Sequence, residues 1–137
     1  MAVTEHSIEL RVRYAETDQM QVVYHANYLV WCEIGRTELM RVLGAPYAEV
    51  EHQGVRLAVT DASLRYHAPA KYDDLIRVTA SLGEVRSRTI EFKYLVTHAE
   101  TGARLVSAAT TLAAITHDGR LTTLPKQLRE LLTNASN

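Results

Sequence analysis

The sequence predicts an α+β domain in which one long helix covers one face of a curved antiparallel sheet. Three observations predict this class. Residues 26–43 contain no proline and repeat apolar side chains at helical spacing, four long segments of strand-like composition follow, and no second helix of comparable length is indicated. With 137 residues, the chain suits a single domain spanning residues 1–137.

The first expected element is a strand between His6 and Tyr14. Its apolar side chains occupy alternate positions, namely Ile8, Leu10, Val12 and Tyr14, with Glu9, Arg11 and Arg13 between them. Alternation with a period of two is typical of a strand with one solvated face.

The long helix is expected at Ala26–Leu43. Its apolar stripe consists of Tyr28, Trp31, Cys32, Gly35, Leu39, Val42 and Leu43. Three- and four-residue spacing places these side chains on one face of a helix. Gly44 and Pro46 predict its end, because glycine accepts the left-handed terminal conformation and proline cannot continue a helix.

The rest of the chain is expected to be mainly strands. One helical turn is indicated at residues 47–52, followed by strands at Val55–Tyr66, Asp74–Glu84, Arg88–His98 and Ala103–Thr116. Residues 117–120 contain Asp-Gly and predict a tight reversal, after which a short strand near Leu121 and a helix at Lys126–Leu132 are expected. Nothing in this pattern covers the second face of the sheet, so we expect a homo-oligomer in which another subunit does so.

Composition and charge exclude several classes of function. A formal net charge of -1 argues against nucleic acid as a general partner. The cationic side chains are mostly arginines, which favours one local site for phosphate or carboxylate. The six histidines show no helical metal-ligand spacing, and the single cysteine, Cys32, cannot form an internal disulfide or a four-cysteine zinc site. We therefore expect no metal.

The sequence also predicts the cellular location of the protein. Its first ten residues include Glu5, His6 and Glu9, where an export signal would need a continuous apolar run. No apolar stretch approaches the ~20 residues that a membrane-spanning helix requires. Together with the lone Cys32, these features predict a cytoplasmic protein with no integral membrane segment.

The segment from Tyr14 to Tyr28 is the strongest candidate for a site, because it is rich in ionisable groups and runs directly into the long helix. Free backbone N–H groups in the first turn of a helix can hold an anion or a developing oxyanion. Asp18 lies at the right distance upstream to fold back over that turn as a base or a nucleophile, and His25 and Asn27 lie where the helix begins.

Structural roles are open for the same residues. Asp18 or Thr17 could only form local hydrogen bonds in the loop, and His25 could be a structural hydrogen-bonding residue. We interpret Glu16 as a solvated loop charge. Cys32 lies in the apolar stripe without an activating neighbour, which argues against a nucleophilic role.

Two runs of residues carry a family resemblance. They are Tyr14-x-x-Thr17-Asp18-x-Met20-x-Val22-Val23-Tyr24-His25-x-Asn27-Tyr28, with Arg36 further along the helix, and Tyr66-x-x-Pro69-Ala70-x-Tyr72-Asp73-Asp74. The whole chain resembles the hotdog-fold acyl-CoA thioesterases of the YbgC and 4-hydroxybenzoyl-CoA thioesterase type. One position departs from the pattern, because Gln21 stands where the family usually has glycine.

The resemblance implies a hydrolase that cleaves acyl-CoA to a free acid and coenzyme A. Asp18 would be the catalytic carboxylate, the backbone N–H of His25 would polarise the thioester carbonyl, and the side chains of Tyr14 and His25 match residues implicated in the YbgC branch. No separate cofactor is implied, since coenzyme A is part of the substrate. A homo-oligomer is implied, with a homotetramer favoured over a dimer.

A second site is implied at Arg86, Ser87 and Arg88, which match a basic segment that contacts coenzyme A phosphates. Arginine forks suit phosphate, although both arginines could equally be solvated hairpin charges. Two other functions stay open: an enoyl-thioester hydratase or dehydratase, whose usual Asp-x-Asn-Pro-x-His segment is missing, and a non-catalytic acyl-CoA-binding protein. A carrier-protein thioester is an open alternative to acyl-CoA as the substrate.

Overall fold

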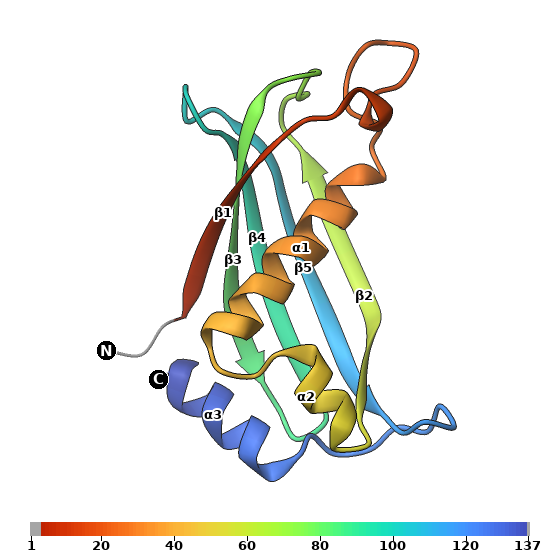
Figure 1. Cartoon of the computed structure of the whole chain (residues 1–137). Coiled ribbons are helices and arrows are strands. Elements are labelled where there is room, and N and C mark those ends of the chain that lie inside the picture. The colour runs from red at the N-terminus through yellow and green to blue at the C-terminus, as the bar shows by residue number, and fades with distance from the viewer. Residues whose placement is uncertain (1–3, 137) are drawn as a thin grey trace.

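The computed structural model describes residues 4–136 of the chain. The element order is β1 (Glu5–Arg11), a 3-10 turn (Tyr14–Glu16), α1 (Asn27–Val42), α2 (Tyr47–His52), β2 (Arg56–Tyr66), β3 (Leu75–Val85), β4 (Thr89–His98), β5 (Arg104–Ile115) and α3 (Lys126–Ser136) (Figure 1). This confirms the expected α+β class and the order of its long elements.

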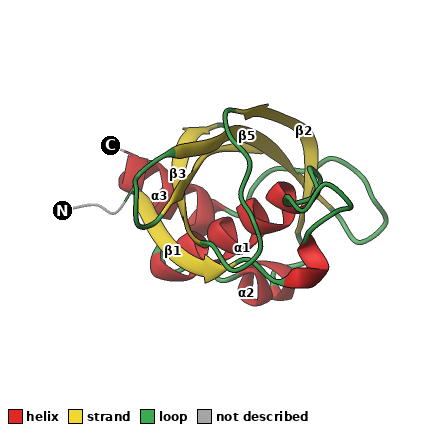
Figure 2. Ribbon diagram, turned by 90° about the horizontal axis from the view of Figure 1, so that it is seen from above, coloured by secondary structure: helices red, strands yellow, loops and turns green. Residues whose placement is uncertain are grey.

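The five strands form one antiparallel sheet in the order β1-β3-β4-β5-β2. The sheet curves around α1, as the view from above shows (Figure 2). Because β1 and β2 are the two ends of this order, each has an edge without a neighbouring strand in the described part of the chain. Such an edge is a template for pairing with another chain.

Helix α1 lies against the sheet along its apolar stripe, except that Val42, which the sequence places in the stripe, is exposed. Tyr28, Trp31, Cys32 and Leu39 are buried, as the sequence predicts. At Gly35 the helix lies very near the sheet, because a Cβ atom there would lie 2.8 Å from Cγ1 of Val78 on β3. A larger residue at this position would push the helix off the sheet.

Three of the expected elements differ clearly from the sequence prediction. The first strand ends at Arg11, and Tyr14 starts a 3-10 turn instead of continuing the strand. The Glu16 carboxylate accepts a hydrogen bond from the Arg13 amide at 2.8 Å, which favours the turn over extended backbone. Near Leu121 there is a single bridge to Ile115 and no strand, and the last helix continues beyond Leu132 to Ser136.

Among residues 4–136, no helix combines the length and the apolar character needed to cross a membrane.

The end of the molecule that carries the candidate loop is the end where α1 begins and β2 finishes (Figure 1). The opposite end holds α2, α3 and the β3–β4 hairpin.

Candidate active site

The Asp18 loop is a short hairpin that turns back toward the start of α1. The Asp18 amide donates to the Val22 carbonyl at 2.9 Å, and the Tyr24 amide donates to the Glu16 carbonyl at 2.8 Å. At the tip, Gln21 has a φ of 67°, a left-handed conformation that glycine adopts more readily. The tip thus retains the backbone conformation that a glycine would favour, although glutamine occupies it.

One oxygen of the Asp18 carboxylate is held and the other is available. Oδ1 accepts a hydrogen bond from the Met20 amide at 2.8 Å. For Oδ2, the described residues provide no hydrogen-bond or ion-pair partner. The side chain is half-buried and lines a cavity of about 300 Å³ together with Tyr14, Thr17, Gln21, Lys71 and Tyr72. The expected local hydrogen bond therefore exists and still leaves an oxygen free for chemistry.

The start of α1 offers unpaired backbone donors. Ala26 precedes the helix and provides no side-chain cap. The amide of Asn27 donates to the Tyr24 carbonyl at 2.9 Å, whereas the amides of His25 and Ala26 have no acceptor within residues 4–136. Unpaired N–H groups at this end of a helix favour negative charge. The backbone therefore has the donors that the sequence analysis required.

The His25 residue is fixed by its neighbours rather than by a catalytic partner. Its ring lies 4.5 Å from the Tyr24 ring, and its carbonyl accepts a hydrogen bond from the Tyr66 hydroxyl at 3.1 Å. The exposed imidazole lines a second cavity, of about 250 Å³, with Val23, Tyr28, Tyr66, His67, Ala68 and Pro69. One chain thus places Asp18 and His25 at the same loop but in separate cavities.

Tyr14 lies on the Asp18 side of the loop. Its ring is 76% exposed and meets the Tyr72 ring edge to face, with a centroid distance of 5.7 Å. Tyr14 therefore shares a cavity with Asp18, and Tyr72 joins them. Sequence reasoning did not assign Tyr72 a place in the site.

Residues 66–74, the second run that carries the family resemblance, hold the Asp18 loop in place. The Val23 amide donates to the Ala70 carbonyl at 2.9 Å, and the Ala70 amide donates to the Tyr28 hydroxyl at 3.1 Å. Val22 also forms a bridge with Lys71. Residues 66–74 therefore support the back of the Asp18 hairpin, which explains why the two runs occur together in one chain.

The interpretation of Glu16 as a solvated loop charge is wrong. Its side chain is 6% exposed and lies between the loop and α1. Burial raises the pKa of this carboxyl, but hydrogen bonds from the Arg13 amide and the Trp31 indole, with the nearby Arg13 charge, hold it below its ordinary value. The missed signal is the indole N–H of Trp31, which needs an acceptor when buried.

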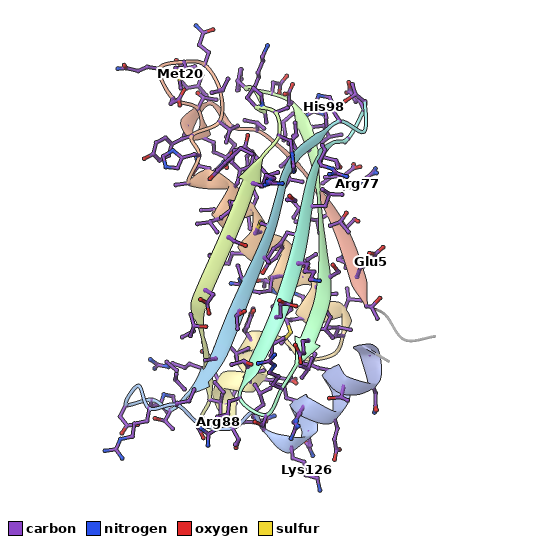
Figure 3. All side chains as sticks on the ribbon, turned by 180° about the vertical axis from the view of Figure 1, so that it is seen from behind. Glu5, Met20, Arg77, Arg88, His98 and Lys126 are labelled. Atoms are coloured by element: carbon purple, nitrogen blue, oxygen red, sulfur yellow. The ribbon has the colours of Figure 1, made fainter. Side chains whose placement is uncertain are left out.

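The residues implied to contact coenzyme A phosphates lie elsewhere in the chain. Arg86, Ser87 and Arg88 are exposed in the β3–β4 hairpin, and Arg86 forms an ion pair of 3.0 Å with Glu84. This ion pair lowers the pKa of the Glu84 carboxyl. Figure 3 shows Arg88 at one end of the molecule and Met20, in the Asp18 loop, at the other. A single chain does not bring the two predicted regions together.

Two further groups are structural. Burial raises the pKa of the Cys32 thiol to about 12, so it stays protonated and is a poor nucleophile. The buried Arg36 guanidinium donates to the hydroxyls of Tyr47 at 2.8 Å and Tyr94 at 3.2 Å, inside the core and away from the loop. Among the described residues, no group of His, Cys, Asp and Glu side chains could hold a metal ion.

Comparison with known proteins identifies the relatives of this chain. The family model of the thioesterase-like superfamily matches residues 12–132. YneP of Bacillus subtilis (strain 168) is 53% identical over 66 residues, which are 48% of each chain. The acyl-CoA thioesterase YbgC of Haemophilus influenzae is 39% identical over 88 residues, covering 64% of this chain and 65% of that protein. In these alignments the chain spans about half of YneP and just under two thirds of YbgC.

The solved structures agree with the fold. The crystal structure of the DHNA-CoA thioesterase from Staphylococcus aureus has a TM-score of 0.91 and 29% sequence identity, and the match covers 96% of this chain and 91% of that chain.

Proposed function

Because the chain belongs to the thioesterase-like superfamily, we propose that it hydrolyses acyl-CoA thioesters to a free carboxylic acid and coenzyme A. The resemblance in family and hotdog fold is confirmed by the family match and the solved structure. The choice of acyl-CoA is supported by the names of the Haemophilus and Staphylococcus relatives. Water and the substrate suffice for this reaction, so no separate cofactor is proposed.

The observation that carries the proposal is the state of the Asp18 carboxylate. Oδ1 is oriented by the Met20 amide, and Oδ2 has no partner among the described residues. Oδ2 can either take a proton from a water molecule as that water attacks the carbonyl carbon, or attack the carbon itself to form a mixed anhydride. In both routes the carbon–sulfur bond breaks and the coenzyme A thiolate leaves and is protonated. In the second route a water molecule then cleaves the mixed anhydride, which releases the carboxylic acid and regenerates the Asp18 carboxylate.

The unpaired amide of His25 suits the second requirement of the reaction. Attack on a thioester concentrates negative charge on the carbonyl oxygen, and a preorganised donor there contributes about 3–4 kcal/mol. The His25 amide has no acceptor among the described residues, and the Tyr24–His25 peptide that carries it is oriented by the hydrogen bond from the Asn27 amide to the Tyr24 carbonyl. The Tyr14 hydroxyl and the His25 imidazole would contact the same substrate at the edge of the site.

We propose that two copies of the chain complete the site. A two-fold axis beside β2 would pair this edge strand with its own copy in antiparallel fashion. That arrangement turns the partner's hairpin end toward the Asp18 end of the first copy. It would allow Arg86, Ser87 and Arg88 of one copy to hold coenzyme A phosphates while Asp18 of the other acts on the thioester. Two such dimers would make the expected tetramer.

We propose that the protein works in the cytoplasm, because its one thiol, Cys32, is buried and free.

The test is thiol release from a panel of acyl-CoA substrates. Wild-type protein is expected to turn over, and Asp18→Asn is expected to lose most of the rate while its thermal unfolding stays close to that of wild type. An Asp18→Asn variant as active as wild type would contradict the assignment of Asp18. Stoichiometric binding without thiol release would indicate an acyl-CoA-binding protein, and loss of enoyl absorbance without thiol release would indicate a hydratase.

Sedimentation tests the assembly. A species of only 15.4 kDa at micromolar concentration would contradict the site shared between copies.

A further inference from the structure

Glu16 lies two residues before Asp18 and joins the Asp18 loop to α1 through its side chain. Oε1 accepts a hydrogen bond from the Arg13 amide at 2.8 Å, and Oε2 accepts one from the Trp31 indole at 2.8 Å. Trp31 lies one turn into α1 and is buried. The carboxylate therefore ties the base of the loop to the body of the helix.

The Glu16 backbone makes a second set of contacts at the same point. Its carbonyl accepts the Tyr24 amide at 2.8 Å and Nδ2 of Asn27 at 2.8 Å. Tyr24 belongs to the returning arm of the hairpin, and Asn27 is the first residue of α1. Side chain and backbone together connect both arms of the hairpin to the start of the helix.

A carboxylate is the side chain that suits this position. Both of its oxygens face N–H donors, and both can accept. A glutamine of the same size has one accepting oxygen, so its NH2 group would face either the Arg13 amide or the Trp31 indole. Two N–H donors would then face each other in a buried contact without an acceptor, and the loop would have to move to separate them.

We propose that Glu16 is a positioning residue for Asp18, holding the Asp18 loop at a fixed place relative to the unpaired His25 amide. This inference rests on the proposed thioesterase function. Glu16 contacts no reacting atom: its carboxylate is buried against α1, whereas Asp18 lines an open cavity. Its effect would be geometric, because reacting groups displaced by about 1 Å can lose a factor of about 100 in rate.

The test compares Glu16→Gln with wild type in the full chain, using steady-state thiol release from an acyl-CoA. We expect kcat to fall about tenfold or more, KM to stay within about twofold, and the pH dependence of kcat to keep its shape, since Asp18 is intact. The matched control is Glu9→Gln, which removes an exposed carboxylate from an ion pair with Arg77 on the sheet. It should leave kcat unchanged.

A second variant covers the case in which Glu16→Gln does not fold. Asn27→Ala removes only the hydrogen bond to the Glu16 carbonyl and leaves the buried carboxylate in place. It should lower kcat a few-fold with KM unchanged.

The outcomes separate this proposal from the proposed function. One outcome is that Asp18→Asn is inactive while Glu16→Gln and Asn27→Ala both keep kcat within twofold of wild type. This outcome would overturn the role of Glu16 and keep that of Asp18. Where Glu16→Gln does not fold, Asn27→Ala alone decides in the same way. Asp18→Asn as active as wild type would overturn both. A changed pH profile in Glu16→Gln would also overturn positioning, since it would indicate a proton-transfer role.

Discussion

The hydroxyl of Tyr66 donates a hydrogen bond of 3.1 Å to the carbonyl of His25, and so links the end of β2 to the residue whose amide is proposed to polarise the thioester. The two residues lie 41 positions apart in sequence. Tyr66 also packs edge to face against Tyr28, at 5.6 Å between ring centroids. The sheet therefore orients the His25–Ala26 peptide, which adjoins the Tyr24–His25 peptide that carries the His25 N–H.

Replacing Tyr66 with phenylalanine tests this link. The ring contact with Tyr28 remains, but the hydrogen bond is lost, which corresponds to about 0.5–1.5 kcal/mol. Because Tyr66 is 51% exposed, we expect thermal stability to change little. The rate should fall roughly two- to tenfold if the peptide orientation matters to the transition state. Steady-state kinetics and a thermal melt measure the two effects, and a rate equal to that of wild type would contradict the link.

Gln21 provides a test of the loop tip. Its φ of 67° costs a non-glycine residue roughly 1 kcal/mol. Glycine would remove this strain but would also raise the entropy of the unfolded chain, so Gln21→Gly should change the free energy of unfolding by less than about 1 kcal/mol and retain activity.

Gln21→Val is the contrasting variant, since a β-branched residue is poorly accommodated at positive φ. It should destabilise the protein by about 1–2 kcal/mol or lower kcat through a shifted loop. Urea unfolding of both variants measures the difference. Glycine and valine variants equal in both stability and kcat would show that the tip conformation is not maintained in solution.

The long elements could be predicted from the sequence because their signals are local. The stripe from Tyr28 to Leu43 and the strand periodicities each lie within one segment. The structure confirms the helix and the four later strands, but Val42 of the stripe is exposed instead of buried. The environment of Glu16 is different. Its burial depends on the indole of Trp31, and the support of the loop depends on Ala70, far away in sequence. A charged residue in a loop is predicted to be solvated unless the residue that buries it is known.

For a similar reason, the separation of Asp18 from Arg86 and Arg88 could not be predicted from the sequence. Motif spacing identifies residue types along a chain, but it does not say which end of a sheet each type occupies. Strand directions place the Asp18 loop and the β3–β4 hairpin at opposite ends. The relation between these two regions would then depend on a second copy, which lies beyond the information in the short motifs.

Acidification tests the electrostatics of Glu16. Its pKa is lowered in the folded state, so the ionised carboxylate contributes stability that is present above the unfolded-state pKa and is lost as the pH falls through the folded-state pKa. At neutral pH we expect Glu16→Gln to be less stable than wild type by about 1–3 kcal/mol, because a buried donor loses its acceptor.

This difference should shrink as the pH falls below the usual range of a glutamic acid, since protonated Glu16 resembles glutamine. Urea unfolding of both proteins at several pH values measures it. A stability difference that stays constant from neutral to acidic pH would show that the charge of Glu16 does not matter.

Shortened substrates test the role of Arg86 and Arg88. If these arginines hold coenzyme A phosphates, replacing either with alanine removes a charge-assisted contact of about 1.5–3 kcal/mol and should raise KM for acyl-CoA about tenfold or more. A pantetheine thioester with the same acyl group carries no nucleotide phosphates, so its KM should not change. Arg41→Ala, which breaks an exposed ion pair with Glu38 on α1, is the control and should affect neither substrate. An equal rise in KM for both substrates would place the effect on folding or assembly rather than on phosphate binding, and an unchanged KM for acyl-CoA would return Arg86 and Arg88 to the role of solvated hairpin charges.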